Sequence, residues 1–490
     1  MGEPGFPMSP SQRSTLTVTM LATFLAVMDQ FIINVALPSI RSDLHASAAE
    51  AEFAVSGYAL VYGALLITGG RLGDLFGYRR LFVLGVATFT LASLGCGLAP
   101  TAEGLIAFRL VQGIGSALFY PQILSFLQTT FDGQARTRAF SMFGAAVGLA
   151  SVCGQVLGGL LVGLDLFGMS WRPVFLINVP LGLAALAGAM SLPRYRGTER
   201  PLLDLRGLIC LTSALLLLSV PLVGGPGWGW PWWSYALLAL ALPAMLAFVL
   251  WERRVALRGG MPLMDPGLFR RRVFATGNGL ALAFFASNAG LFFVLTLHLQ
   301  QDLGRTPLES GLTFAPLTLA FIVASLSAPR IQHRLGLHVL TCGYGLNLVG
   351  VLALFLFAVT DGPGSRTGVP WFLPAALTVI GLGQGLGVSP LLGALLSDVP
   401  RVHAGAASGV VETTAQVGAS LGTAGAGLVF RSPQGHAATP SAFSQALTVN
   451  VALSLTALLL MALVTRPQLQ GGKEEPFLTT ADQNSPGVLS

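Results

Sequence analysis

Long apolar segments, separated by short polar breaks, recur along almost the whole chain. A helix needs about 20 apolar residues to cross the hydrocarbon core of a bilayer, and these segments reach that length. The pattern predicts an all-α integral membrane protein with fourteen transmembrane helices. The predicted spans cover residues 15–40, 52–70, 81–99, 104–127, 139–163, 173–192, 204–223, 232–251, 273–299, 308–328, 337–359, 370–396, 404–430 and 444–465.

The basic residues are distributed unevenly between the loops on the two sides of the predicted bundle. Cytoplasmic loops of membrane proteins carry the excess of Arg and Lys. With the N-terminus inside, alternate loops hold most of the 27 basic residues. The opposite loops hold Arg41, Arg172, Arg305, Arg366 and Arg431. This bias predicts an even number of spans, with both chain ends in the cytoplasm.

Short patterns in the first six spans return eight spans later. The stretch Gln112–Gly115 returns as Gln384–Gly387, the loop Arg71–Gly77 has a partner at Arg330–Gly336, and Gly154 and Gly158 return as Gly418 and Gly422. Such repeats are typical of transporters built from two similar halves. The offset of eight predicts two six-helix bundles with two inserted helices. The predicted domains are an N-terminal bundle at 1–203, two linker helices with a basic loop at 204–272, a C-terminal bundle at 273–466 and a disordered cytoplasmic tail at 467–490.

The composition excludes several other classes of protein. Apolar residues make up 53% of the chain and charged residues 10%, as expected for a protein whose solvent is the bilayer. The basic residues are dispersed and form no patch for nucleic acid. Lys473 is the single lysine, so a nucleotide-binding loop ending in Gly-Lys-Ser/Thr is absent. No nucleophile with a base and no metal-ligand spacing is found, so we expect no enzyme activity, no cofactor and no metal.

The predicted turn between the second and third spans carries a motif. Glycines there permit a tight turn and a close approach of the backbones. This loop resembles the signature loop of the major facilitator superfamily, in which an Asp and an Arg hold two halves together in the outward-facing state. The second copy has His333 in place of the acid, so the first copy is expected to act as the latch. The predicted gate residues are Gly70, Arg71, Asp74, Gly77, Arg79 and Arg80.

Asp29 lies near the middle of the first span, with no other formal charge between Arg13 and Arg41. An ionised carboxylate there costs roughly 2.5 to 3.5 kcal/mol on insertion scales, so it needs a reason. The segment Met28–Pro38, which includes the predicted cavity residue Asn34, resembles the first-helix motif of the fourteen-span drug:proton antiporters. The resemblance implies that Asp29 handles protons or cations beside a solvent-reachable cavity. The alternative is a protonated, hydrogen-bonded structural Asp.

Four polar residues share one face of the fourth span, because Arg109, Gln112, Ser116 and Tyr120 follow helical spacing. We expect this face to line a water-filled cavity. The stretch Arg109–Ala117 resembles the fourth-helix motif of the superfamily, whose Arg is linked to proton transfer. An arginine stays charged, so its expected role is to favour the ionised form of a nearby acid, for which Asp29 is the candidate. Structural anchoring is the alternative.

The fifth span is rich in glycines at intervals that let helices touch backbone to backbone. It resembles the fifth-helix antiporter motif, although Gln155 stands where that motif usually has proline. Ordinary tight packing is the alternative. The motif glycines are Gly144, Gly148, Gly154, Gly158 and Gly159.

A second deep acid, Glu412, shares a face of span thirteen with Ser408 and Gln416. We expect it to act as a proton site or a cation anchor, the alternative being a protonated packing acid. Phe284, Phe285, Phe292 and Phe293 are expected to add aromatic surface. The remaining predicted cavity residues are Tyr58, Tyr62, Asn278, Asn288, Gln384 and Gln416.

These motifs together predict a proton-coupled secondary exporter of hydrophobic or amphipathic, cationic small molecules, with Asp29, Arg109 and Glu412 coupling protons. The expected partners are a small-molecule substrate, protons and the lipid bilayer, without nucleic acid. The expected form is a monomer in a bacterial plasma membrane. The alternatives are a dedicated exporter of one endogenous metabolite or antibiotic, a proton symporter, and a receptor without transport.

Overall fold

The structure is a computed structural model of the 490-residue chain. It describes residues 8–165, 168–194, 204–258, 266–270, 272–336, 338–360, 372–397, 399, 404–430 and 440–470.

The first part of the chain forms helices that pack on one another. They are α1 (Pro10–Asp43), α2 (Ala48–Phe76), α3 (Tyr78–Leu98), α4 (Ala102–Thr130), α5 (Gly133–Leu164), α6 (Pro173–Leu176) and α7 (Asn178–Ala189). Ser9 and Gln12 begin α1 with reciprocal hydrogen bonds, and Ser47 and Glu50 begin α2 in the same way. These caps satisfy the free N–H groups of the first turns.

Two further helices, α8 (Leu205–Trp228) and α9 (Trp232–Leu257), pack against each other, and α8 also contacts α2. The short 3₁₀ helix η2 (Pro266–Arg270) leads to the last group. That group consists of α10 (Arg272–Leu297), the π-helical turn η3 (His298–Asp302), α11 (Pro307–Thr313), α12 (Ala315–Leu335), α13 (His338–Thr360), α14 (Leu373–Ser397), α15 (Ala404–Phe430) and α16 (Pro440–Gln470).

Each predicted span coincides with a helix, but 173–192 and 308–328 are each divided between two helices. The breaks fall at Ile177 and Phe314, shortly before Pro180 and Pro316. A proline lacks the N–H that would bond the carbonyl four residues earlier, so the helix is interrupted there.

Ten of the described helices are long and apolar enough to cross a membrane. Two shorter apolar stretches, Pro173–Ala189 and Arg206–Leu222, accompany them. The helices α12 and α15 are less apolar, because α12 ends in a basic segment and α15 is rich in Gly, Ala and Thr.

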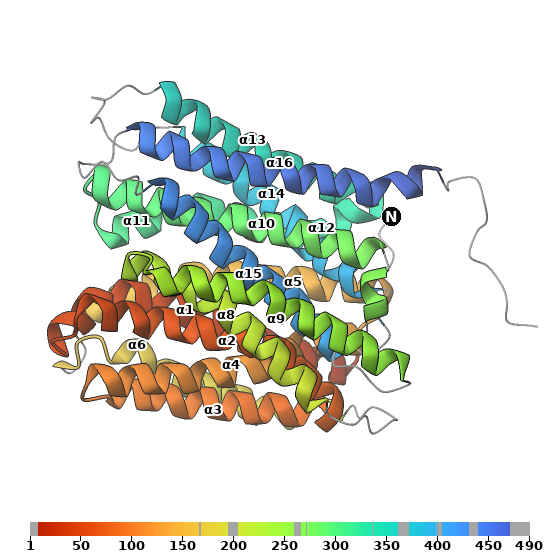
Figure 1. Ribbon diagram of the computed structural model, residues 1–490, viewed down its shortest axis with the longest axis horizontal. Helices are drawn as coiled ribbons and strands as arrows, with labels where there is room; N and C mark the ends of the chain where they lie inside the picture. Colours follow the sequence, from red (N-terminus) through yellow and green to blue (C-terminus); the bar gives the residue numbers. More distant parts are fainter. Residues whose placement is uncertain are drawn as a thin grey trace, which may run out of the picture.

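The helices form two bundles with a shared boundary. Figure 1 shows α1, α2, α3, α4 and α6 on one side, α10 to α14 with α16 on the other, and α5 and α15 between them. Across the boundary, α2 packs on α15, and α5 packs on α12 and α14. The helices α1 to α7 are called the first bundle below, and the helices α10 to α16 are called the second bundle.

The bundles touch toward the end of the molecule that carries the loop of Arg71, Arg79 and Arg80, called the arginine-rich end below. A Cβ on Gly409 of α15 would lie 2.7 Å from the Cα of Ile67. A Cβ on Gly148 of α5 would lie 2.7 Å from the ring of Phe321. Farther along the same helices, Gly57 and Gly158 instead face side chains of their own bundle. The helices α2 and α15, and likewise α5 and α12, therefore meet through their halves nearer the arginine-rich end, and α5 also contacts α11 nearer the opposite end.

The predicted repeat of α5 in α15 agrees with the packing. Gly154 faces the carbonyl of Met28 in α1, and Gly418 faces the carbonyl of Leu282 in α10, each at 2.7 Å from a Cβ built on the glycine. These glycines therefore occupy equivalent contacts in the two bundles, where a larger residue would push the helices apart.

The predicted repeat of α4 in α14 is wrong by one helical turn. Gly113 lies against the backbone of Tyr58, and Gly381 lies against the backbone of Leu317, the residue equivalent to Tyr58 when the two loops are aligned. Gly113 therefore corresponds to Gly381 and not to Gly385. Glycines recur at one-turn spacing in α14, so the sequence match alone left the register open.

We expect Gly69→Ala to destabilise the protein by about 1 to 3 kcal/mol, because its Cβ would collide with the carbonyl oxygen of Ala117 in a closely packed core. The measurement is thermal unfolding in detergent. Gly163→Ala is the matched control, since a Cβ there meets nothing within 4 Å. Equal unfolding midpoints for the two variants would contradict the packing described.

Candidate functional site

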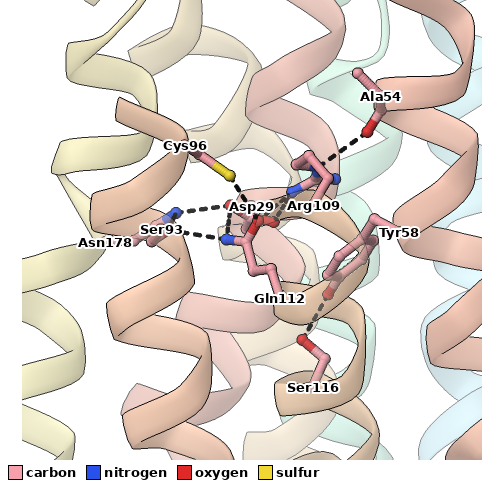
Figure 2. Close-up of polar contacts among 9 residues, drawn as sticks. All are labelled: Asp29, Ala54, Tyr58, Ser93, Cys96, Arg109, Gln112, Ser116 and Asn178. Atoms are coloured by element: carbon pink, nitrogen blue, oxygen red, sulfur yellow. Dashed lines mark hydrogen bonds and ion pairs between the residues drawn. The ribbon is translucent and has the colours of Figure 1, made fainter. Parts of the chain in front are cut away.

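Asp29 is fully buried in the first bundle and forms an ion pair with Arg109. The Nη1 atom of Arg109 lies 2.7 Å from Oδ2 of Asp29. The other carboxylate oxygen accepts hydrogen bonds from Gln112 at 2.9 Å and from Asn178 at 2.7 Å. Figure 2 shows these side chains converging on Asp29, with Arg109 and Gln112 coming from α4 and Asn178 from α7. The carboxylate is thus surrounded by donors, the arrangement that a buried negative charge requires.

The partners of Asp29 are themselves held by further hydrogen bonds. Arg109 donates through Nε to the carbonyl of Ala54 at 3.0 Å, and through Nη1 to Gln112 at 2.7 Å. The hydroxyl of Ser93 accepts from Gln112 at 2.8 Å and from Asn178 at 3.0 Å. The network therefore joins α1, α2, α3, α4 and α7 through side chains that have few alternative positions.

The close approach of α2 to α4 positions an aromatic ring beside this network. Gly113 lacks a side chain where α4 meets the backbone of Tyr58. The Arg109 guanidinium lies 4.2 Å from the centre of the Tyr58 ring, and the Tyr58 hydroxyl is hydrogen-bonded to Ser116 at 2.8 Å (Figure 2). A cation over an aromatic face is attracted by the ring quadrupole. Arg109 therefore has both an anionic and an aromatic partner.

A cavity of about 320 Å³ lies between the two bundles. Its wall combines residues of α1, α2, α4 and α5 with residues of α10, α11, α12, α14 and α15. Most of its surface is apolar, with few polar groups. Its aromatic residues are Phe31, Tyr62, Tyr120, Phe143, Phe284, Phe285, Phe292, Phe314 and Phe321.

Glu412 carries the formal charge in the described wall of this cavity. Its side chain is half-buried, and within the described chain it has no hydrogen-bond or ion-pair partner. It lies close enough to Tyr62 and Tyr120 for electrostatic interaction with both. A carboxylate beside aromatic rings, with no cation to neutralise it among the described residues, suits a cationic ligand.

The predicted cavity residues fall into two groups. Tyr62, Tyr120, Asn288, Gln384 and Gln416 are on the wall, and Gln384 donates to Asn288 at 2.6 Å. Tyr58, Gln112, Ser116 and Asn278 are buried and are not among the residues of this wall. The side chain of Asn34 lies outside the described residues.

This placement differs from the expectation that one face of α4 lines the cavity. Tyr120 does so, but Arg109, Gln112 and Ser116 face the interior of the first bundle. Asp29 is likewise away from the wall, although the next residue, Gln30, is on it. The reason is that buried polar groups must be satisfied, and these side chains satisfy one another inside the bundle.

Asn278 and the antiporter-motif glycines have packing contacts. Asn278 donates to the carbonyl of Phe274 at 2.8 Å and accepts from Thr414 at 3.1 Å. Gly144 faces Ser325 and Ser389 of the second bundle, whereas Gly148 lies on the cavity wall. The other motif glycines are Gly154 and Gly158, which face α1, and the half-buried Gly159.

The predicted gate loop meets the start of α15. Asp74 accepts from the backbone N–H of Gly405 at 2.8 Å and of Ala406 at 2.9 Å, and from the Tyr78 hydroxyl at 2.9 Å. Free N–H groups and the helix dipole make a helix N-terminus attractive to a carboxylate. Arg71 is 3.9 Å from Asp74.

The other gate residues support this turn. Gly77 ends α2 with a φ of 93°, a conformation that favours glycine. Gly70 lies against the backbone of Gly405. Arg79 donates to the carbonyl of Leu192, and Arg80 is exposed.

Sequence reasoning assigned no role to Gln30, Ser93 or Asn178. Asn178 and Ser93 are polar residues within apolar spans, and this signal marks them as bundle-facing. Nothing in the pattern of apolar residues identified Phe143, Phe314 or Phe321 as wall residues, because phenylalanines that face lipid and phenylalanines that face a cavity have the same spacing.

The second bundle has apolar residues where the first bundle has its polar centre. The glycine contacts that relate the bundles pair Asp29 with Ala283 and Arg109 with Leu377. They pair Gln112 with Ile380, which is fully buried, as is Leu377. The buried ion pair is therefore a feature of one half of the molecule.

We expect Asp29→Ala to cost about 3 to 5 kcal/mol of stability, because it leaves the Arg109 charge buried without its partner. Asp43→Ala is the matched control, since its ion pair with Arg172 has the same 2.7 Å separation but is partly exposed, which limits the cost to about 0 to 1 kcal/mol. Thermal unfolding in detergent measures both. A loss no larger for Asp29→Ala than for Asp43→Ala would contradict this account.

The chain is similar to known proteins over most of its length. The chain is 38% identical over 430 residues to a probable actinorhodin transporter of Streptomyces coelicolor, which covers 87% of this chain and 74% of that protein. It is 37% identical over 424 residues to a cephamycin export protein of Amycolatopsis lactamdurans, with 84% and 85% of the two chains covered. The fold is similar to that of the human organic anion transporter MFSD10, with a TM-score of 0.68 at 15% identity, over 93% of this chain and all of that one.

The family model for the major facilitator superfamily matches residues 19–423. This match covers most of the chain and confirms the predicted fold class, in which helices alone form the membrane domain. It also confirms that the protein moves small molecules across a membrane and is not an enzyme. The chain therefore belongs to the major facilitator superfamily of multi-pass membrane transporters.

Proposed function

We propose that this protein is a proton-coupled exporter of hydrophobic or amphipathic small cations. The observation that carries the proposal is the cavity between the bundles, whose apolar wall with its aromatic side chains includes the carboxyl group of Glu412, which has no partner within the described part of the chain. Its volume of about 320 Å³ is within the range of small-molecule sites. The names of the two relatives, a transporter and an export protein of antibiotics, support outward transport.

Proton coupling is assigned to Asp29 and Arg109. In the arrangement seen here, Asp29 is ion-paired and has donors on both oxygens. When Asp29 takes a proton, Arg109 loses its counter-charge and the network must rearrange. One proton that enters down a potential of 100 mV supplies about 2.3 kcal/mol, enough to move a substrate against its gradient if exchange is strict.

Alternating access supplies the route. The arginine-rich end is assigned to the cytoplasm by its excess of basic residues, which also places both chain ends there. At this end α2 packs on α15 and Asp74 binds the start of α15, and we therefore assign the arrangement seen here to an outward-facing state. Two six-helix bundles, at 1–203 and 273–466, would then rock about the cavity, with α8 and α9 as the linker.

A dedicated exporter of one endogenous antibiotic is the second candidate, because both relatives are named for a single compound. Transport of a chemically varied panel of compounds into everted vesicles distinguishes the broad exporter from the dedicated exporter. Uptake of several unrelated lipophilic cations favours the broad exporter, and uptake of one compound favours the dedicated exporter. Substrate movement in the same direction as protons would instead identify a symporter.

We expect Asp29→Asn to reduce proton-driven substrate accumulation in everted vesicles at least tenfold, because an amide cannot take up a proton. Substrate exchange without a pH gradient should remain. Proton movement is followed with a pH-sensitive dye, and substrate with a radiolabel. Unchanged proton-driven accumulation in the variant would remove Asp29 from the coupling.

We expect Glu412→Gln to weaken binding of tetraphenylphosphonium about tenfold, or about 1.4 kcal/mol, because the phosphonium cation loses its charge attraction to the carboxylate. Binding of neutral triphenylphosphine oxide, which has similar aromatic surface, should change less than twofold. Glu103→Gln, at an exposed acid of α4, is the control for loss of charge. Equal weakening of both ligands would argue against a cation site at Glu412.

A further inference from the structure

We propose that the ring of Tyr58 couples the substrate cavity to the proton site, so that substrate and proton exclude each other. The inference rests on the proposed function, since it needs a proton at Asp29 and a substrate in the cavity. It gives Tyr58 a role as a positioning residue, distinct from the cavity wall in which sequence reasoning placed it.

A continuous series of contacts leads from the ion pair to the cavity. The Arg109 guanidinium lies 4.2 Å from the centre of the Tyr58 ring. Tyr58 stacks on Tyr62, with ring centres 5.8 Å apart and planes at 15°. Tyr62 meets Tyr120 edge to face at 5.9 Å, and both of these rings are on the cavity wall near Glu412. One ring, that of Tyr58, therefore separates Arg109 from the wall along this path.

The Tyr58 side chain, which comes from α2, is held against α4, the helix that carries Arg109. It is 1% exposed, and its hydroxyl is hydrogen-bonded to Ser116, two helical turns from Arg109 on α4. The absence of a side chain at Gly113 lets the backbone of Tyr58 lie directly against α4. Tyr58 is thus held between Arg109, Ser116 and Tyr62, and a displacement of Arg109 or Tyr62 must be transmitted through it.

The contact between Arg109 and the Tyr58 ring depends on the protonation state of Asp29. While Asp29 is ionised, the Arg109 charge is largely neutralised by the carboxylate. Once Asp29 is protonated, the Arg109 charge remains in the bundle interior with the carbonyl of Ala54, the amide of Gln112, the more distant Phe175 ring at 5.8 Å and the face of the Tyr58 ring as its partners. The ring therefore stabilises the protonated state more than the ionised one.

Titratable and polar groups face Asp29 from several neighbouring helices. Arg109 from α4 is the cation, and Tyr58 from α2 and Cys96 from α3 are the neutral titratable groups that interact with Asp29. The helices α5 and α7 present Gly154 and Asn178. Among these described groups, Tyr58 is the one that also contacts a ring of the cavity wall.

Substrate binding and protonation of Asp29 therefore each oppose the other. A substrate packed on Tyr62 and Tyr120 holds Tyr58 and Arg109 as they are here, in the arrangement where Asp29 is ion-paired. Protonation lets Arg109 turn further onto Tyr58, which displaces Tyr62 and alters the wall on which the substrate packs. Linkage requires the two effects to be equal in free energy.

The test is the pH dependence of binding of neutral triphenylphosphine oxide to the purified full-length protein, measured at pH 8 and pH 6, because protonation of Glu412 on the wall does not change the charge attraction to a neutral ligand. We expect the dissociation constant of the wild type to rise about tenfold or more at pH 6. In Tyr58→Leu the affinity at pH 8 should remain within threefold of wild type, and the rise at pH 6 should fall below twofold. Tyr58→Phe keeps the ring and should retain most of the pH dependence.

Tyr344→Leu is the matched control, because Tyr344 is an equally buried ring of the second bundle that contacts the wall residue Phe284 but not Arg109. It should keep the wild-type pH dependence. Full pH dependence in Tyr58→Leu, or its loss in Tyr344→Leu to the same extent, would overturn the proposal. No pH dependence in the wild type would instead count against the proposed proton coupling itself.

A second measurement does not depend on the folding of Tyr58→Leu. Wild-type protein labelled with 3-fluorotyrosine gives a ¹⁹F resonance for Tyr58, which is assigned by its loss in Tyr58→Phe. We expect this resonance to shift both on acidification and on addition of tetraphenylphosphonium, and the acid-induced shift to disappear in Asp29→Asn. A resonance that responds to neither would overturn the proposal.

Discussion

The buried ion pair of Asp29 and Arg109 is the constraint on which the first bundle depends. Two charges in an apolar interior are tolerable only if their geometry is good and their remaining hydrogen-bonding capacity is used. Here the carboxylate takes bonds from Arg109, Gln112 and Asn178, and the guanidinium also bonds the backbone of Ala54. Satisfying these two charges fixes the positions of five helices relative to one another. A change at either charge is therefore expected to alter the packing of these helices.

The two bundles share a backbone design but differ in chemistry. Equivalent glycines let α5 approach α1 and α15 approach α10, so the same helix packing occurs twice. The second bundle nevertheless has Ala283 and Leu377 where the first has Asp29 and Arg109. Its deep carboxyl group, that of Glu412, is instead on the cavity wall. Proton chemistry and cation recognition can then reside in different halves and communicate through the surfaces at the cavity.

Much of the fold follows from the sequence because bilayer thickness sets the length of a spanning helix, and each predicted segment is helical in the structure. The pairing of Asp29 with Arg109 was also accessible, since a lone acid and a lone arginine in apolar spans need each other. Helical spacing shows that Arg109, Gln112, Ser116 and Tyr120 share a face, but it does not show what that face meets. Three of these side chains meet the bundle interior and one meets the cavity, a difference that tertiary packing decides.

The contact between Asp74 and α15 can be compared in free energy with the proton movement that is proposed to drive transport. A hydrogen bond to a charged group contributes about 1.5 to 3 kcal/mol. One proton moving through 100 mV supplies about 2.3 kcal/mol, which is similar to one or two such bonds. In the proposed cycle, the bonds from Gly405 and Ala406 to Asp74 would hold the arginine-rich end together and would break once per cycle. A latch of this strength suits the proposed cycle, because a much stronger one would stop it and a much weaker one would let the substrate leak.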